Sequence, residues 1–225
     1  MTRHLYLVGY RGTGKSTVGR LVARTLGWPF VDLDERIEAE AGTSIAGIFA
    51  AEGEAGFRDR EAAALAEASA QMGGAACLSR KRERRAPTGM VASESSEDTD
   101  ADTGASLTLP ALKEETADPE WAVIATGGGI ILREENRRIL KATGFVVWLQ
   151  ACAEAIWERV RADTLTAARR PNLTVAGGLP EIVELLAVRE RYYTEVADVR
   201  VPTDGRSPEA VAASILTLFR SIPTD

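Results

Sequence analysis

Gly9-Tyr10-Arg11-Gly12-Thr13-Gly14-Lys15-Ser16 is the stretch that decides the fold. It satisfies the pattern GxxxxGK(S/T) of a phosphate-binding loop. The apolar run 5–8 before it predicts a strand, and apolar residues at helical spacing after it predict a helix over 16–26. Because this loop binds phosphate between a strand and a helix, the sequence predicts a nucleotide-binding α/β protein.

The residues of this loop have distinct expected tasks. Glycines let consecutive backbone N–H groups converge on phosphate oxygens, and the helix N-terminus adds positive potential. Lys15 adds a formal charge, and the hydroxyl of Ser16 can bind a magnesium ion. We expect the nucleotide phosphates to contact Gly12, Thr13, Gly14, Lys15, Ser16 and Thr17.

Further apolar runs predict the rest of a central sheet. They lie at 30–33, 121–126, 145–149 and, more weakly, 199–201, and helices are expected over 57–71 and 208–220. Near-continuous apolar runs suit strands that helices cover on both faces. The fold class is therefore α/β, with a central, mainly parallel five-stranded sheet between two helical layers.

Length and composition bound the kind of protein. A chain of 225 residues with 45% apolar content suits one domain, and a net charge of -6 argues against a nucleic-acid binder. Cys77 and Cys152 lie far apart and have no CxxC spacing, which suggests neither a disulfide framework nor a structural zinc site. We expect no export or membrane signal. We expect a monomeric cytoplasmic domain in which His4 is a solvent-facing strand-edge residue without a catalytic role.

Residues 79–120 break this pattern. The basic run 80–85 is followed by a stretch over 93–103 that is rich in Ser, Thr, Glu and Asp. Such a composition offers few apolar side chains to offset the entropy of ordering, so we expect a disordered charged insertion. A nucleic-acid or localisation patch is the alternative, although the neighbouring acidic run can neutralise the basic one.

Asp32 and Asp34 lie two apart, and on an extended chain their side chains point to the same side of the sheet. In that arrangement Asp32 can hold water on the magnesium ion while Asp34 contacts an accepting hydroxyl. Asp34 could equally cap the helix that follows it, because aspartate is a preferred N-cap residue. Their spacing leaves both roles open.

Together the motifs resemble those of the shikimate kinase family, in family order and across nearly the whole chain except the insertion. They are 9–17, Asp32-Leu33-Asp34, Phe57-Arg58 with Glu61, Gly127-Gly128-Gly129, Arg170-Pro171, and Arg189 before Tyr193-Thr194-Glu195-Val196-Ala197. The resemblance implies a three-layer P-loop kinase fold with a mobile lid. It also implies an ATP- and Mg²⁺-dependent enzyme that phosphorylates the 3-hydroxyl of shikimate on the route to chorismate and the aromatic amino acids.

The resemblance also implies which residues surround shikimate: Asp34, Arg58, Gly128, Gly129 and Arg189. Asp34 would contact the hydroxyls, and the two arginines would hold the carboxylate, which a guanidinium matches in a bidentate fork. Glu61 is three residues after Arg58 and can orient it without touching substrate. Without the resemblance, Arg58 would be read as an ordinary helix-surface arginine.

Residues 162–175 correspond to the family's lid, in which Arg170 would neutralise the transferring phosphate. Lys15, Asp34 and Arg170 are thus the expected catalytic residues, Ser16 and Asp32 the expected metal ligands, and Arg161 and Pro208 the residues flanking adenine. Arg191 is a rival to Arg189, because the segment 189–193 departs from the family pattern; Arg189 has the matching distance to Tyr193.

Two other classes of function share parts of this pattern. A gluconate or nucleoside monophosphate kinase would share the loop and the fold but not the acceptor set of acids, arginines and glycines. A nucleotide-binding module without catalysis would have lost that set. ADP release with and without shikimate separates these possibilities.

Overall fold

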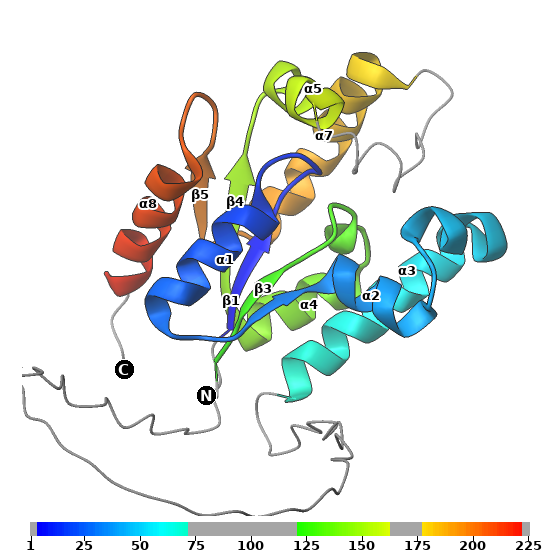
Figure 1. Cartoon of the computed structure of the whole chain (residues 1–225), viewed down its shortest axis with the longest axis horizontal. Coiled ribbons are helices and arrows are strands. Elements are labelled where there is room, and N and C mark those ends of the chain that lie inside the picture. Colours follow the sequence, from blue (N-terminus) through cyan, green and yellow to red (C-terminus); the bar gives the residue numbers. More distant parts are fainter. Residues whose placement is uncertain (1–3, 72–120, 163–176, 222–225) are drawn as a thin grey trace, which may run out of the picture. The chain divides into compact units, whose positions relative to one another are not determined.

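The computed structural model describes residues 4–71, 121–162 and 177–221 (Figure 1). The insertion expected at 79–120 and the lid expected at 162–175, apart from residue 162, lie outside these residues. The helices and strands are, in chain order, β1 (His4–Val8), α1 (Lys15–Leu26), β2 (Phe30–Asp32), α2 (Leu33–Ala41), α3 (Ile45–Gln71), β3 (Val123–Ala125), η1 (Ile130–Leu132), α4 (Glu134–Thr143), β4 (Gly144–Gln150), α5 (Ala153–Ala162), α7 (Gly178–Val196), β5 (Val199–Pro202) and α8 (Pro208–Arg220).

The five strands form one sheet in the order β2-β3-β1-β4-β5, and every pair is parallel. This confirms the predicted five-stranded sheet. In β1, Leu5 pairs with Val123 of β3 on one side and with Phe145 of β4 on the other, so β1 lies at the centre. Its carboxyl end therefore places the phosphate loop in the middle of the sheet edge.

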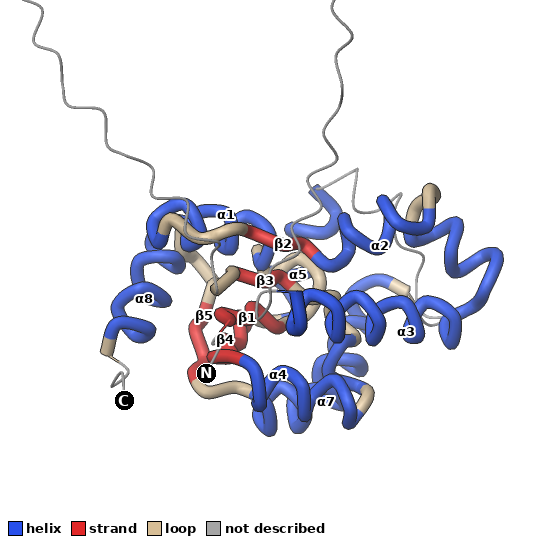
Figure 2. The backbone as a smooth tube through the Cα atoms, turned by 90° about the horizontal axis from the view of Figure 1, so that it is seen from below, coloured by secondary structure: helices blue, strands red, loops and turns tan. Residues whose placement is uncertain are grey.

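Helices cover both faces of the sheet, with α1 and α8 on one face and α3, α4 and α7 on the other (Figure 2). The side chains of β1 alternate between the two apolar cores: Leu5 and Leu7 pack in the core with α1 and α8, and Tyr6 and Val8 pack in the opposite core. This alternation is the period of two of a strand, and it explains why a strand buried on both faces reads as continuously apolar.

The prediction that His4 faces solvent is wrong. His4 is fully buried, because it begins the central strand and is covered on its face of the sheet by α3. Its Nε2 lies 3.4 Å from the Ser69 carbonyl oxygen, and its ring meets that of Tyr6 edge-on. Burial lowers the pKa of His4, so the imidazole is held neutral.

Three connections leave the sheet at its carboxyl edge and carry the motifs found in the sequence. The phosphate loop follows β1, the segment 127–129 follows β3, and Asp32 ends β2. In open parallel sheets, ligands bind outside this edge. Among the described residues, no helix is both long and apolar enough to span a membrane.

Candidate active site

The phosphate loop adopts the conformation that its glycines allow. Gly12 and Gly14 have φ of 77° and 88°, in the left-handed region that side chains other than glycine's disfavour, and α1 begins directly after Gly14. The hydroxyl of Thr13 donates to the Tyr10 carbonyl at 2.8 Å and closes the loop. Backbone N–H groups at this helix terminus are free of intrahelical partners, which suits an anion.

Lys15 lies folded along the loop. Its Nζ donates to the carbonyl oxygens of Gly9 at 2.9 Å and Tyr10 at 2.8 Å, and the residue is buried. These contacts hold the ammonium group over the loop itself. The ammonium group thus lies beside the loop that the sequence predicted to bind phosphate.

Ser16 and Asp32 meet as the magnesium prediction requires. The Ser16 hydroxyl donates to Asp32 Oδ2 at 2.5 Å, so a hydroxyl and a carboxylate oxygen are adjacent at the start of α1. Mg²⁺ is commonly held by one or two such protein oxygens together with substrate phosphates and water, so the pair fits this ion. Elsewhere in the described part of the chain, no group of three or more His, Cys, Asp or Glu side chains could hold a metal.

The structure corrects the geometry expected for Asp32 and Asp34. The chain is not extended through both residues, because α2 begins at Leu33. Asp32, and not Asp34, is the N-cap: its Oδ1 accepts from the backbone N–H of Asp34 at 3.0 Å and of Glu35 at 3.4 Å. Asp32 therefore caps the helix with one oxygen while the other faces Ser16, and Asp34 is left in the first turn.

Asp34 lies against the glycine segment after β3. A Cβ placed on Gly127 would be 3.1 Å from Asp34 Oδ1 and 2.1 Å from Glu61 Oε1. Two carboxylate side chains thus lie where a side chain at Gly127 would be. The expected neighbourhood of Asp34 and the glycine segment is thus present, and Glu61 lies there too, which the sequence did not predict.

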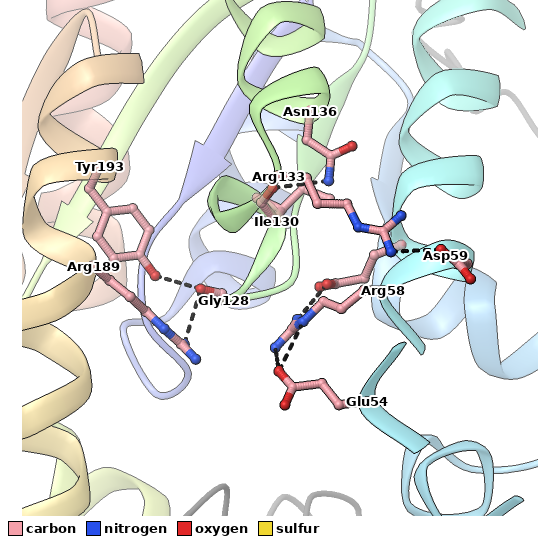
Figure 3. A network of polar contacts seen from close by, with 10 residues as sticks. Glu54, Arg58, Asp59, Gly128, Ile130, Arg133, Asn136, Arg189 and Tyr193 are labelled. Carbon is pink, nitrogen blue, oxygen red and sulfur yellow. Dashed lines mark hydrogen bonds and ion pairs between the residues drawn. The ribbon is translucent and has the colours of Figure 1, made fainter. Parts of the chain in front are cut away.

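Arg58 is held between two carboxylates on α3 (Figure 3). Its Nη1 donates to Glu61 Oε2 at 2.5 Å, and its Nη2 donates to Glu54 Oε1 at 3.0 Å. Burial acts to lower the pKa of Arg58, but the charges and hydrogen bonds of Glu61 and Glu54 outweigh it and raise that pKa. The predicted pairing of Arg58 with Glu61 is confirmed, and it fixes the guanidinium in one orientation.

Gly129 leaves room for the guanidinium group of Arg58. A Cβ on Gly129 would lie 2.0 Å from Arg58 Nη1 and 2.4 Å from its Cζ. The sequence suggested that these glycines make room for a substrate ring. The structure gives another reason, which is that Gly127 and Gly129 make room for the side chains of Glu61 and Arg58.

Arg189 approaches the same segment from α7, on the side opposite to Arg58 (Figure 3). Its Nη1 donates to the Gly128 carbonyl at 3.3 Å, and the buried Tyr193 hydroxyl donates to the same oxygen at 2.7 Å. Burial raises the pKa of Tyr193, which keeps this phenol neutral and able to donate. Arg191 is exposed and donates to the Tyr192 hydroxyl, so the geometry favours Arg189 over its rival.

Arg159 is a contact to the phosphate loop that the sequence analysis missed. Its Nη1 donates to Gly12 O at 3.4 Å and to Thr203 Oγ1 at 2.9 Å, whereas the predicted Arg161 is exposed. Residues two apart on a helix point in directions about 200° apart. Only one of Arg159 and Arg161 can therefore face the loop, and the orientation of α5 about its axis decides which. Pro208 is the first residue of α8, behind the N-cap Ser207, and Arg170 lies outside the described residues.

Comparisons with known proteins show the family of this chain. The family model described as shikimate kinase matches residues 11–91 and 108–220, which include the loop from Arg11 onward, Asp34, Arg58, the glycine segment and Arg189. Shikimate kinases of Symbiobacterium thermophilum and Rhodopirellula baltica are each 39% identical to this chain over 95% of its length, covering 94% and 89% of the relatives.

Solved structures give the same result. Shikimate kinase from Acinetobacter baumannii, in complex with shikimate, has a TM-score of 0.72 and 31% identity, over 98% of this chain and 94% of that one. Shikimate kinase from Aquifex aeolicus has a TM-score of 0.64 and 28% identity, over 96% of each chain. With the parallel sheet and the assembled motifs, these matches place the chain in the shikimate kinase family.

Proposed function

We propose that this protein transfers the terminal phosphoryl group of ATP to the 3-hydroxyl of shikimate, giving shikimate 3-phosphate and ADP on the route to chorismate and the aromatic amino acids. One observation carries the substrate assignment: Arg58 and Arg189, from α3 and α7, reach opposite sides of the segment 127–129. Two guanidinium groups converging beside a backbone without side chains suit a small organic carboxylate.

The nucleotide half of the site adjoins this acid half. A Cβ on Gly128 would lie 3.3 Å from the backbone nitrogen of Arg11 and 3.4 Å from the Gly9 carbonyl oxygen, so the glycine segment touches the phosphate loop. An acid held at the glycines is therefore next to a phosphate held at the loop. Such proximity is the main requirement of phosphoryl transfer, in which the protein positions the reactants and neutralises charge.

The expected roles of the side chains follow from their places. Gly12, Thr13, Gly14 and Thr17 would cradle the phosphates with Lys15, and Asp34 would accept a hydrogen bond from the hydroxyl that attacks. Arg58, oriented by Glu61, and Arg189 would hold the carboxylate beside Gly128 and Gly129. Arg170 would add positive charge from the lid. Arg161 and Pro208 would flank adenine. Arg159 is the alternative to Arg161, because it contacts Gly12 of the loop.

Ser16 and Asp32 would hold Mg²⁺ through the hydroxyl and carboxylate oxygens that now hydrogen-bond to each other. When bound, the ion neutralises negative charge on the nucleotide phosphates. Asp32 keeps its second oxygen for capping α2, so the carboxylate is already oriented before a nucleotide arrives. We further propose that the protein is a cytoplasmic monomer in which 79–120 is an insertion within a single domain.

A coupled assay of ADP release tests this function. With ATP and Mg²⁺, we expect release to depend on shikimate and to give shikimate 3-phosphate. Gluconate and a nucleoside monophosphate should give no stimulation. Stimulation by one of these acceptors but not by shikimate would assign another kinase, and ATP binding without turnover on any acceptor would indicate a binding module.

A further inference from the structure

Arg11 lies inside the phosphate loop, but its side chain reaches α7. Its Nη2 donates to Glu181 Oε1 at 3.1 Å. Glu181 is in the first turn of α7 and is fully buried, and the Arg11 side chain is 12% exposed. Burial of a carboxylate costs free energy that a nearby cation offsets, so breaking this ion pair would be unfavourable. The pair therefore holds the loop against α7.

The pair adjoins Tyr10, which is also buried. The Cζ of Arg11 lies 5.9 Å and that of Arg189 5.4 Å from the centroid of the Tyr10 ring, so one ring contacts both guanidinium groups. Burial raises the pKa of Tyr10, the two arginines oppose that rise, and Glu181 adds to it. The phenol thus lies in the field of all three charges.

The positions of these groups depend on one another. Arg189 rests on the Tyr10 ring and on the Gly128 carbonyl, and the backbone of Gly128 lies against Arg11 and Gly9. Displacement of the loop at residue 11 would therefore move both supports of Arg189. Glu181 and Arg189 are eight residues apart on α7, about 12 Å along the helix axis, so one rigid helix carries the anchor of the loop and the acid-binding arginine.

The charges of Arg11, Glu181 and Arg189 do not cancel. Arg11 and Arg189 carry two positive charges, and Glu181 carries one negative charge that is hydrogen-bonded to Arg11. Arg189 donates to a neutral backbone carbonyl, and in the part of the chain that the structure describes no carboxylate is hydrogen-bonded to it. A substrate carboxylate would be attracted to Arg189 as long as Glu181 stays paired with Arg11.

We infer that Arg11, held by Glu181, is a positioning residue for the acid half of the site, which acts through Tyr10 and Arg189 although Arg11 belongs to the nucleotide loop. The inference rests on the proposed function. It has an unusual kinetic consequence, because a side chain of the phosphate loop should control the KM for the acid and not the KM for ATP.

The test compares Arg11→Met, Arg11→Lys and a matched control, Arg20→Met. Arg20 also pairs with a glutamate, Glu35, but both side chains are at least half exposed. We expect Arg11→Met to raise the KM for shikimate about tenfold, or about 1.4 kcal/mol, with kcat and the KM for ATP within about twofold. Arg11→Lys should restore most of the affinity, since an ammonium group can still pair with Glu181, and Arg20→Met should match the wild type.

Each other outcome is informative. An unchanged KM for shikimate in Arg11→Met, or a rise in the KM for ATP instead, would overturn the inference. If Arg11→Met does not fold because Glu181 has lost its ion pair with Arg11, the double variant Arg11→Met/Glu181→Gln removes the buried charge and should show the same rise in KM. Wild-type protein that releases no ADP with shikimate would refute the proposed function itself.

Discussion

Gly129→Ala tests the packing of the acid site, because one methyl group there should displace Arg58 without disturbing the backbone. Gly129 has φ of -105° and ψ of 0°, which alanine can adopt. The new Cβ would lie 2.0 Å from Arg58 Nη1, 2.4 Å from Cζ and 2.6 Å from Nη2. Carbon atoms in contact are normally separated by about 3.5–4.0 Å, so the guanidinium must move by more than about 1 Å.

That movement removes the contact that orients Arg58. Nη1 is the atom that donates to Glu61 Oε2, and the Glu61 side chain is almost fully buried. A hydrogen bond to a charged group contributes about 1.5–3 kcal/mol, so the loss of an oriented Arg58 should cost the bound carboxylate about 2 kcal/mol. The KM for shikimate should rise about thirtyfold, while the free energy of unfolding changes by about 1 kcal/mol because the clash falls on the end of a flexible side chain.

Steady-state kinetics of Gly129→Ala, Arg58→Ala and the double variant measure this directly, with urea unfolding as the control for stability. If the methyl group acts by displacing Arg58, the double variant is no worse than Arg58→Ala, because the shortened side chain leaves room for the Cβ. Additive losses in the double variant, or a normal KM in Gly129→Ala, would refute this reasoning.

Other predictions concern the loop, the buried histidine and the insertion. Lys15→Ala should lower ADP release with shikimate by at least about 10²-fold, because it removes a preorganised cation at the phosphates; normal turnover would exclude Lys15 from the site. Because burial lowers the pKa of His4 in the folded state, its contribution to stability is complete above its unfolded pKa of 6.5 and is lost as pH falls below that value. Urea unfolding between pH 7.5 and 5 should show that His4→Gln removes up to about 1.4 kcal/mol per pH unit of this dependence, and an unchanged slope would contradict it. Deletion of 79–119 should leave kinase activity, and an inactive but folded deletion protein would refute the insertion as a linker.

The sequence predicted the sheet and the closing helix well, because their signals are local. The expected helix over 208–220 is α8, Pro208–Arg220, with Ser207 as its N-cap and proline in its first turn. The strands were found because apolar runs buried on both faces are distinctive in composition. The expected strand at 121–126 is shorter in the structure, at Val123–Ala125, where the ladder with β1 sets its limits.

The errors occur where tertiary packing decides. His4 belongs to a strand that is central only because β3 and β4 flank it, which its local sequence does not reveal. The sequence offered Asp34 as a cap of the next helix, but the cap is Asp32, because the chain leaves the sheet there and α2 begins at Leu33. Arg11 and Glu181 are 170 residues apart, so no spacing rule could join them.

A crystal structure with shikimate and a non-hydrolysable ATP analogue tests the central claim most directly. The account predicts that the carboxylate of shikimate accepts hydrogen bonds from Arg58 and Arg189 while its 3-hydroxyl faces Asp34 and the terminal phosphate. An acid bound away from these arginines, or with its hydroxyl directed away from the terminal phosphorus, would contradict it.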